Sequence, residues 1–284
     1  KTQGGFYMTT FLVAAIQMDT TSNQDQNLSV AADFIGEAAK KGAKLIALPE
    51  TMAYLGRDYA ALSEAVPGGK TATYLSALAR KYGVYIEGGS LYERNENDPV
   101  RPYNTTFLLG PDGAFLGKYS KLHPFDVVLD SGVTSRESSH VAPGHEIVTV
   151  KTAGVGTLGF GICYDLRFGE LFRLMALRGA QILVLPANFT EATGRAHWEV
   201  LVRARAIENE CYVIAPNQVG KKPRFTAYGH SLIVDPRGKV LAEADGTETG
   251  VIYAPIDLDL VSKVRKETFT LQNRREDIYS LCLK

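Results

Sequence analysis

Short apolar runs alternate with segments of helical periodicity along almost the whole chain, and this alternation limits the possible folds. An apolar run of about four to eight residues is typical of a buried strand, whereas apolar residues three and four apart are typical of an amphipathic helix. In residues 27–41, for example, Leu28, Ala31, Ala32 and Ile35 share one helical face. Interleaved strands and helices predict an α/β protein whose sheets are covered by helices.

The pattern can be divided into elements and one domain. Strands are predicted over 11–18, 45–48, 84–90, 103–109, 114–121, 157–163, 182–185, 211–215, 229–234, 239–243 and 251–256, and helices over 27–41, 71–82, 169–178 and 195–210. Residues 126–144 lack a clear period and are predicted to form a long loop, a common active-site wall. Without linkers or repeats, residues 11–284 are expected to form one domain. Residues 1–10 are expected to be an N-terminal extension or a tag remnant, with Met8 as an alternative native start.

The composition argues against several classes of partner. Lys and Arg total 31, as do Asp and Glu, so a net charge of +0 creates no field that attracts nucleic acid. We see no apolar stretch long enough to cross a bilayer and no signal-peptide core at the start. The three cysteines are far apart in sequence, which indicates free thiols in a reducing compartment, and we expect a cytoplasmic protein.

Three predicted strands lead into side chains that can carry out chemistry. Glu50 follows strand 45–48, Lys121 ends strand 114–121 and Cys163 ends strand 157–163. Taken singly, a lone cysteine is commonly a core thiol and a lysine at a strand end is commonly solvated, while a glutamate there is either solvated or directed into a cleft. Together, a carboxylate, an ammonium group and a thiol supply the base, charge stabiliser and nucleophile of a hydrolase.

The segments around these three residues resemble the signature blocks of the nitrilase (carbon–nitrogen hydrolase) superfamily. The blocks read LPE, KYSKLH and GICYDLRFGEL, and the likeness extends from Phe11 to Tyr279. Three further segments resemble the Nit branch of ω-amidases and deaminated-glutathione amidases: PANFTEATGRAHWEVLVRARAIENECYVIAPNQVG, YGHSLIVDPRGKV and LQNRREDIY. The resemblance implies a four-layer αββα sandwich. It also implies a homodimer or higher homo-oligomer, with residues 169–178 and 195–210 near the interface.

The resemblance also implies a role for each reactive residue. Cys163 would be the nucleophile that forms a thioester, and Glu50 the general base that takes its proton and later activates water. Lys121 and the backbone N–H of Tyr164 would hold the oxyanion. Glu137, in the predicted loop, would orient Lys121 and the substrate amide.

Four other residues are candidates for substrate binding. Arg167 could fork onto a substrate carboxylate, because a guanidinium matches its geometry, or pair with a neighbouring acidic residue as ordinary structure. Asn188 follows strand 182–185 and could form the pocket rim, while Tyr54 and Phe189 are weaker candidates.

Motifs of other chemistries do not fit their required context. Residues 154–159 match G-x-G-x-x-G but run into a predicted strand instead of opening a helix, so we expect a turn there. None of the five histidines lies in an H-x-x-x-H or H-E-x-x-H pattern, and no serine lies in a G-x-S-x-G elbow. We therefore expect no metal and no cofactor.

The predicted function is cysteine-dependent hydrolysis of the terminal amide of a small carboxylic acid, with release of ammonia. The leading substrates are deaminated glutathione or a 2-oxo acid ω-amide. N-carbamoyl or nitrile hydrolysis by the same three residues is an alternative, and a non-catalytic binding or scaffold protein is an alternative of another class. Gly169 and Arg237 stand where a proline and a tryptophan are common in the family.

Overall fold

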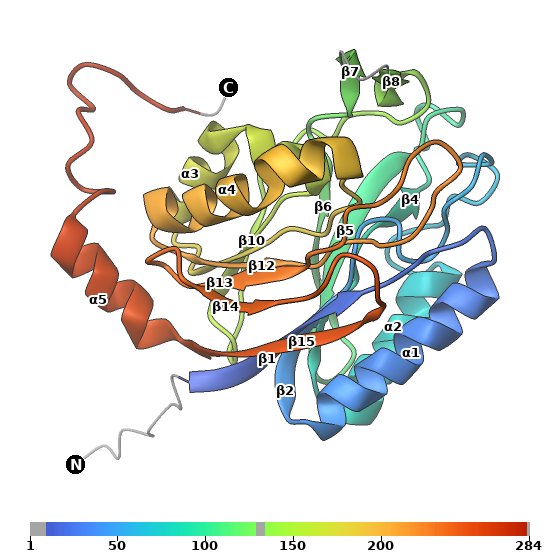
Figure 1. The fold of residues 1–284 in the computed structure, drawn as a ribbon, viewed down its shortest axis with the longest axis horizontal. Helices are drawn as coiled ribbons and strands as arrows, with labels where there is room; N and C mark the ends of the chain where they lie inside the picture. Colours follow the sequence, from blue (N-terminus) through green and yellow to red (C-terminus); the bar gives the residue numbers. More distant parts are fainter. Residues whose placement is uncertain (1–9, 129–133, 283–284) are drawn as a thin grey trace.

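The computed structural model describes residues 10–128 and 134–282, which form two β-sheets between two helical layers (Figure 1). The larger sheet contains β1 (Thr10–Gln17), β2 (Ala43–Ala47), β3 (Tyr85–Glu87), β4 (Leu91–Glu93), β5 (Tyr103–Leu109), β6 (Phe115–Ser120) and β15 (Gly250–Asp257). The smaller contains β9 (Thr149–Lys151), β10 (Thr157–Phe160), β11 (Ile182–Val184), β12 (Tyr212–Ala215), β13 (Leu232–Val234) and β14 (Val240–Glu243).

Helices cover the outer face of each sheet. The helices are α1 (Gln24–Lys40), α2 (Lys70–Tyr82), α3 (Gly169–Leu177), α4 (Glu191–Asn209) and α5 (Leu258–Thr268), with 3-10 helices η1 (Glu137–Ser139) and η2 (Cys163–Arg167). α1 and α2 lie against the larger sheet and α3 and α4 against the smaller one, while α5 leads away at one edge (Figure 1). The expected four-layer αββα sandwich is confirmed.

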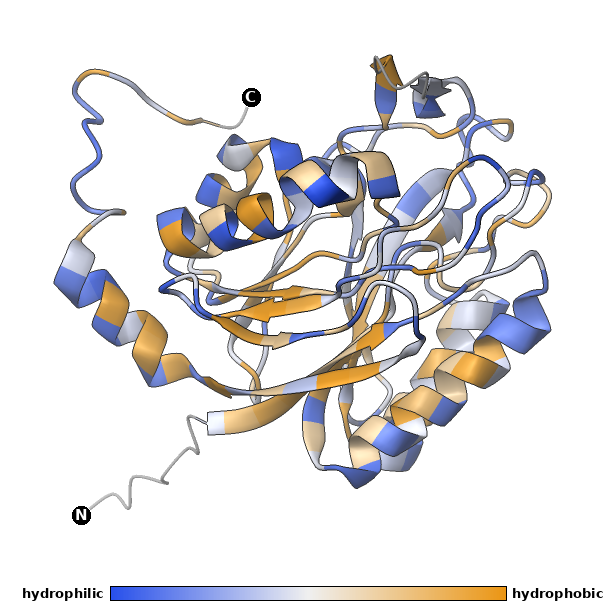
Figure 2. Ribbon diagram, in the orientation of Figure 1, coloured by the Kyte–Doolittle hydropathy of each residue, from blue (hydrophilic) through white to orange (hydrophobic). Residues whose placement is uncertain are grey.

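The central strands of the sandwich, such as β3, β11 and β12, are buried on both faces, which explains their continuous apolar sequence. In β1, Val13 and Ala15 join the cluster between the two sheets, whereas Ala14 and Ile16 join the cluster beneath α1 and α2. This alternation follows from the two-residue period of a strand. Figure 2 shows the result as apolar central strands between helices that carry polar outer faces.

Parallel pairing brings several strand ends to one edge. β1, β2 and β3 pair in parallel in one sheet, and β10, β11 and β12 pair in parallel in the other. β6 runs in the same direction as β3, because both strands pair antiparallel with β5. The segments after β2, β6, β10 and β11 can therefore meet, and ligands commonly bind at such carboxyl ends.

Two predicted helices begin earlier in the structure than in the sequence prediction. α1 begins at Gln24 and α4 at Glu191, because side chains of the preceding residues cap them. Asn23 accepts a hydrogen bond from the Gln26 N–H, and Thr190 accepts one from the Thr193 N–H. The first turns of both helices are polar, so they do not extend the apolar pattern from which the helix starts were predicted.

The predicted bounds of several strands and of one loop differ from those in the structure. The strand predicted to end at Cys163 ends at Phe160, and the strand predicted from 229 begins at Leu232, since Gly229 and His230 have positive φ values of 70° and 54°. The loop predicted over 126–144 contains a small hairpin of β7 (Asp126–Val128) and β8 (Thr134–Arg136), then η1. Three-residue strands are too short to show a period.

Other elements were not predicted, and part of the chain is outside the structure. β4, β9 and α5 were missed, and α5 is a short helix that buries only Val261 and Val264. Most of the predicted N-terminal extension lies outside the described residues, and β1 begins at Thr10. The turn predicted over 154–159 is shorter in the structure, because the chain bends at 154–155 and residues 157–159 already belong to β10. Within the described ranges, no helix is long and apolar enough to span a membrane.

Candidate active site

A cavity of about 410 Å³ lies at the strand ends described above. Its lining includes all the predicted site residues but one: Glu50, Lys121, Glu137, Cys163, Tyr164, Arg167, Asn188 and Phe189. These residues come from both sheets, so the site exists only because the two sheets pack together. The segment after β12 also contacts these residues, because the Gln218 side chain donates a hydrogen bond to the backbone carbonyl of Glu50 at 2.9 Å.

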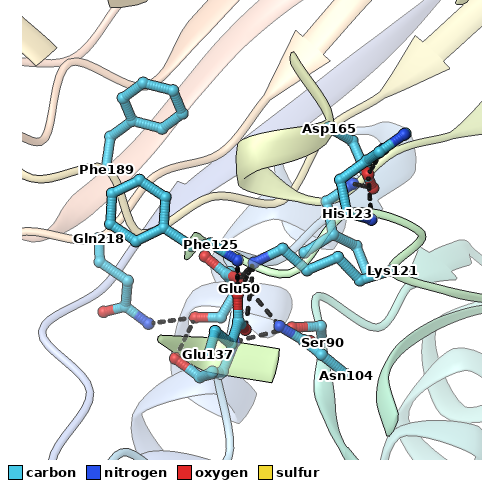
Figure 3. A network of polar contacts seen from close by, with 12 residues as sticks. Glu50, Ser90, Asn104, Lys121, His123, Phe125, Glu137, Asp165, Phe189 and Gln218 are labelled. Carbon is cyan, nitrogen blue, oxygen red and sulfur yellow. Dashed lines mark hydrogen bonds and ion pairs between the residues drawn. The ribbon is translucent and has the colours of Figure 1, made fainter. Parts of the chain in front are cut away.

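Lys121 lies between two carboxylates at the bottom of this cavity (Figure 3). Its Nζ is 3.0 Å from Glu50 Oε1 and 2.9 Å from Glu137 Oε2. Asn104 donates to the same Glu50 oxygen at 2.9 Å, and the Phe125 backbone N–H donates to Glu137. The Lys121 and Glu50 side chains are only 2% and 6% exposed, so solvent screens this interaction little.

The charge state of Lys121 follows from this arrangement. Burial by itself would lower the pKa of Lys121, but the Glu137 and Glu50 carboxylates outweigh burial and hold the pKa well above its usual value. The ammonium group therefore stays charged across the pH range in which an enzyme works. A permanent cation beside a nucleophile is suited to stabilise a developing oxyanion.

Cys163 lies at a sharp bend directly after β10. It is the first residue of η2, it has φ of 48°, and its N–H donates to the Pro186 carbonyl at 2.9 Å. Such a positive φ is uncommon for a residue with a side chain and often occurs at functional sites. The bend ends the strand and directs the thiol into the cavity.

The Cys163 thiol needs a base before it can react. Burial, and then the negative charge of Glu50, raise the pKa of the thiol well above its usual value, despite the opposing charge of Lys121. The Glu50 carboxylate lines the same cavity as the thiol, close enough for its charge to act on the thiol pKa. A protonated thiol near a carboxylate is the arrangement that general-base activation requires.

Asp165 joins the turn that carries Cys163 to the segment that carries Lys121. This fully buried carboxylate accepts hydrogen bonds from the Tyr119 hydroxyl at 2.7 Å and the Ile162 N–H at 2.9 Å. It also contacts His123, through the backbone N–H at 3.1 Å and Nδ1 at 2.7 Å (Figure 3). Sequence reasoning missed this role, because the partners are distant in sequence.

Arg167 reaches the cavity without a structural ion pair. Its guanidinium lies 5.8 Å from the centroid of the Phe189 ring, and Nη2 is 3.3 Å from His197 Nδ1. Neither Asp165 nor Glu170 forms an ion pair with it in the described parts of the chain. The structural ion pair, which was one of the two sequence interpretations of Arg167, is therefore not observed in the described chain.

Asn188 lines the cavity and carries a buried acceptor without a partner in the described chain. Its Oδ1 is buried and has no hydrogen-bond partner among the described residues, and the same holds for Oδ1 of Asn104. A buried polar atom without a partner is costly, so such atoms at a cavity wall suit donors on a ligand.

Tyr54 is the predicted site residue that the structure does not bring to the cavity lining. It is buried in a small cluster with Tyr92 and Val141, and its hydroxyl accepts from the Asp58 N–H at 3.4 Å. Its sequence neighbours Thr51, Leu55 and Tyr59 do line the cavity.

Several lining residues had no signal in the sequence. Most come from loops that show no period, namely Thr51, Leu55, Tyr59, His140, Arg224 and Phe225, whereas Asn104 lies in β5 and Thr193 in α4. Within residues 10–128 and 134–282, no group of three or more His, Cys, Asp or Glu side chains is arranged to hold a metal ion.

Comparisons with known proteins give a consistent result. A family model described as carbon-nitrogen hydrolase matches residues 12–266. The chain is 39% identical to the omega-amidase NIT2 of Homo sapiens over 98% of this chain and 99% of that one. It is 40% identical to the deaminated glutathione amidase of Synechocystis sp. (strain PCC 6803 / GT-S), over 94% of this chain and 99% of that one.

Solved structures show the same fold. The Caenorhabditis elegans NitFhit protein superposes with a TM-score of 0.90 at 36% identity, covering 97% of this chain and 67% of that one. Saccharomyces cerevisiae Nit3, described as a member of branch 10 of the nitrilase superfamily, superposes with a TM-score of 0.84 at 33% identity, covering 94% and 96%.

Proposed function

The chain belongs to the carbon-nitrogen hydrolase family, and on this basis we propose that Cys163, Glu50 and Lys121 hydrolyse the amide of a small acid that carries a carboxylate. The observation that supports these roles most is the buried contact of Lys121 with Glu50 and Glu137 beside a protonated thiol. The enzyme class itself, an amidase-type carbon–nitrogen hydrolase, follows from the family.

Each proposed step has a group in place. Glu50 takes the thiol proton of Cys163, and the sulfur attacks the amide carbon. The oxyanion is held by Lys121 Nζ and the backbone N–H of Tyr164, in the first turn of η2, where helix N–H groups lack internal partners. Glu50 then protonates the departing amine, and later deprotonates the water that hydrolyses the thioester. Glu137 keeps Lys121 in position.

The remaining lining residues support a substrate with a carboxylate. Arg167 would hold that carboxylate on the acyl side, because its guanidinium has no acidic partner in the described chain. Asn188 Oδ1 would accept an N–H of the substrate amide. The two kinds of relative suggest two substrates. One is the ω-amide of a 2-oxo dicarboxylic acid, which releases ammonia, and the other is deaminated glutathione, which releases a peptide amine.

A homodimer through the α3 and α4 layer is also part of this proposal. Val200 and Ile207 on α4 are 68% and 50% exposed, and Leu177 at the end of α3 is 37% exposed. Apolar side chains on one outer layer suit a protein interface. The buried free thiols of Cys163 and Cys211 suit a reducing compartment such as the cytoplasm.

The test is product release from a panel of ω-amides, N-carbamoyl compounds, nitriles and the deaminated tripeptide, with Cys163→Ala in parallel. We expect hydrolysis of the ω-amide or of the deaminated tripeptide, and none by the variant. Mass spectrometry of the unmodified enzyme, quenched during turnover, should detect an acyl adduct on Cys163. Hydrolysis that persists in Cys163→Ala would overturn the assignment of the nucleophile.

A further inference from the structure

A short hairpin over residues 220–227 contributes Arg224 and Phe225 to the cavity wall. Lys221 and Thr226 form an antiparallel bridge, the Lys222 N–H donates to the Phe225 carbonyl at 2.7 Å, and the Ala227 N–H donates to the Gly220 carbonyl at 2.9 Å. The tip of this hairpin is formed by residues 223–225. Arg224 and Phe225 both line the cavity.

The base of the hairpin is tightly anchored. Lys222 is only 4% exposed, and its Nζ contacts Asp19 Oδ1 at 2.6 Å and the Thr20 carbonyl at 3.3 Å. Thr190, next to the cavity, forms a further antiparallel bridge with Ala227. An anchored base presents the tip in a defined position, as a binding residue requires.

Arg224 faces the cavity wall made by Tyr59 and His140. Those two rings stack 4.8 Å apart, and the charge of Arg224 acts on both of them. Arg224 is exposed and has no ion pair among the described residues. An exposed arginine without a partner, placed over a cavity, is free to bind an anion.

The charges that line the cavity leave room for two anions. The two carboxylates at the bottom already pair with Lys121, whereas Arg167 and Arg224 pair with no acidic side chain in the described chain. The volume of about 410 Å³ lies within the roughly 300–1,000 Å³ that holds drug-sized ligands, so it exceeds the needs of a small ω-amide.

We propose that Arg224 binds a second carboxylate, on the amine side of the scissile bond, so that the preferred substrates are peptide-like amides with an acidic end on both sides. This inference rests on the proposed function. The acyl and amine parts lie on opposite sides of the attacked carbon. If Arg167 holds the acyl carboxylate, the other unpaired arginine is left for the amine part.

The experiment uses two amides with the same acyl group, a 2-oxo dicarboxylic acid. In one, the amine is a dipeptide with a free carboxylate; in the other, the dipeptide ends in a carboxamide. We expect Arg224→Gln to lower kcat/KM about tenfold more on the carboxylate than on the carboxamide, mainly through KM. Arg224→Lys should restore part of the preference for the carboxylate, since lysine keeps the positive charge but lacks the planar guanidinium that binds a carboxylate through two N–H groups.

Lys221→Gln is the matched control, because it removes the same charge from the same hairpin without touching the cavity. This variant should change kcat/KM by the same factor on both amides. Equal losses on both amides in Arg224→Gln, or no loss on either, would overturn the role of Arg224. If the unmodified enzyme hydrolyses neither amide nor the simple ω-amide, the proposed function fails instead.

Discussion

At the bottom of the cavity the charged groups are buried and paired, whereas at its mouth they are more exposed and the arginines have no ion pair in the described chain. We call the first group the floor (Glu50, Lys121, Glu137 and Cys163) and the second the rim (Arg167, Arg224, Tyr59 and His140). A buried charge is costly unless it is paired, so the floor has one stable arrangement. The rim lacks this constraint, and its partners can come from the substrate.

The difference assigns separate tasks to the two regions. The floor holds chemical groups at fixed distances, with help from Asp165 and Asn104, and should determine the rate of the chemical step. The rim should determine which amide binds. Changes in the floor should therefore reduce kcat, and changes in the rim should raise KM.

The largest expected effect is that of Glu50→Gln. The amide can still accept a hydrogen bond from Lys121 but cannot take the thiol proton, so kcat should fall about 10³-fold or more. Steady-state kinetics on the best amide would measure this, with thermal unfolding to show an intact fold. Activity within tenfold of the unmodified enzyme would refute the role of Glu50 as base.

Lys121→Gln tests the charge of the floor. Loss of the oxyanion cation should lower kcat about 10²- to 10³-fold. It also leaves Glu50 and Glu137 without their cation, so the variant should be less stable and should lose stability further as the pH rises. Chemical denaturation at several pH values would measure the stability. Lys121→Arg, which keeps the charge, should unfold like the unmodified protein.

Glu87 offers a contrast to the floor, because it is a buried carboxyl that forms no ion pair within the described residues. It ends β3 next to β2, accepts a hydrogen bond from Thr106, and has one oxygen without a partner among the described residues. Burial raises the pKa of Glu87 from 4.5 to about 8. The folded protein therefore keeps a proton that the unfolded chain releases between these values.

The contribution of Glu87 to the free energy of unfolding should be fully present below pH 4.5. It should fall by about 1.4 kcal/mol per pH unit as the pH rises towards the folded pKa of about 8, and stay level above it. Glu87→Gln should lack this slope. Urea unfolding at pH 5, 6, 7 and 8 would measure it, and parallel curves for both proteins would exclude a protonated Glu87.

Tyr59→Ala should have the smallest effect and tests the rim. It removes the stacking on His140 and the edge contact with Tyr92, each worth roughly 1 kcal/mol. KM should rise about three- to tenfold while kcat changes less than twofold, as steady-state kinetics can show. A large loss of kcat instead would mean that the rim and the floor are coupled.

The sequence was sufficient for the elements that have a clear period and for the reactive residues that lie in family motifs. The apolar runs predicted most strands of both sheets, and the blocks around Glu50, Lys121 and Cys163 predicted which side chains meet. Both signals are local: a period is repeated within a dozen residues, and a motif within ten. Short strands such as β7, and helix starts fixed by caps, carry too little apolar signal to be placed this way.

By itself, then, the sequence determined the fold class and the chemical groups, because strand and helix periods and short motifs depend on neighbours along the chain. Tertiary structure alone decided the positive φ of Cys163, the four contacts of Asp165, the exclusion of Tyr54 from the cavity and the position of Arg224 over it. These features depend on groups far apart in sequence, such as Lys121 and Glu50, whose separation of 71 residues is closed only when the sheets form.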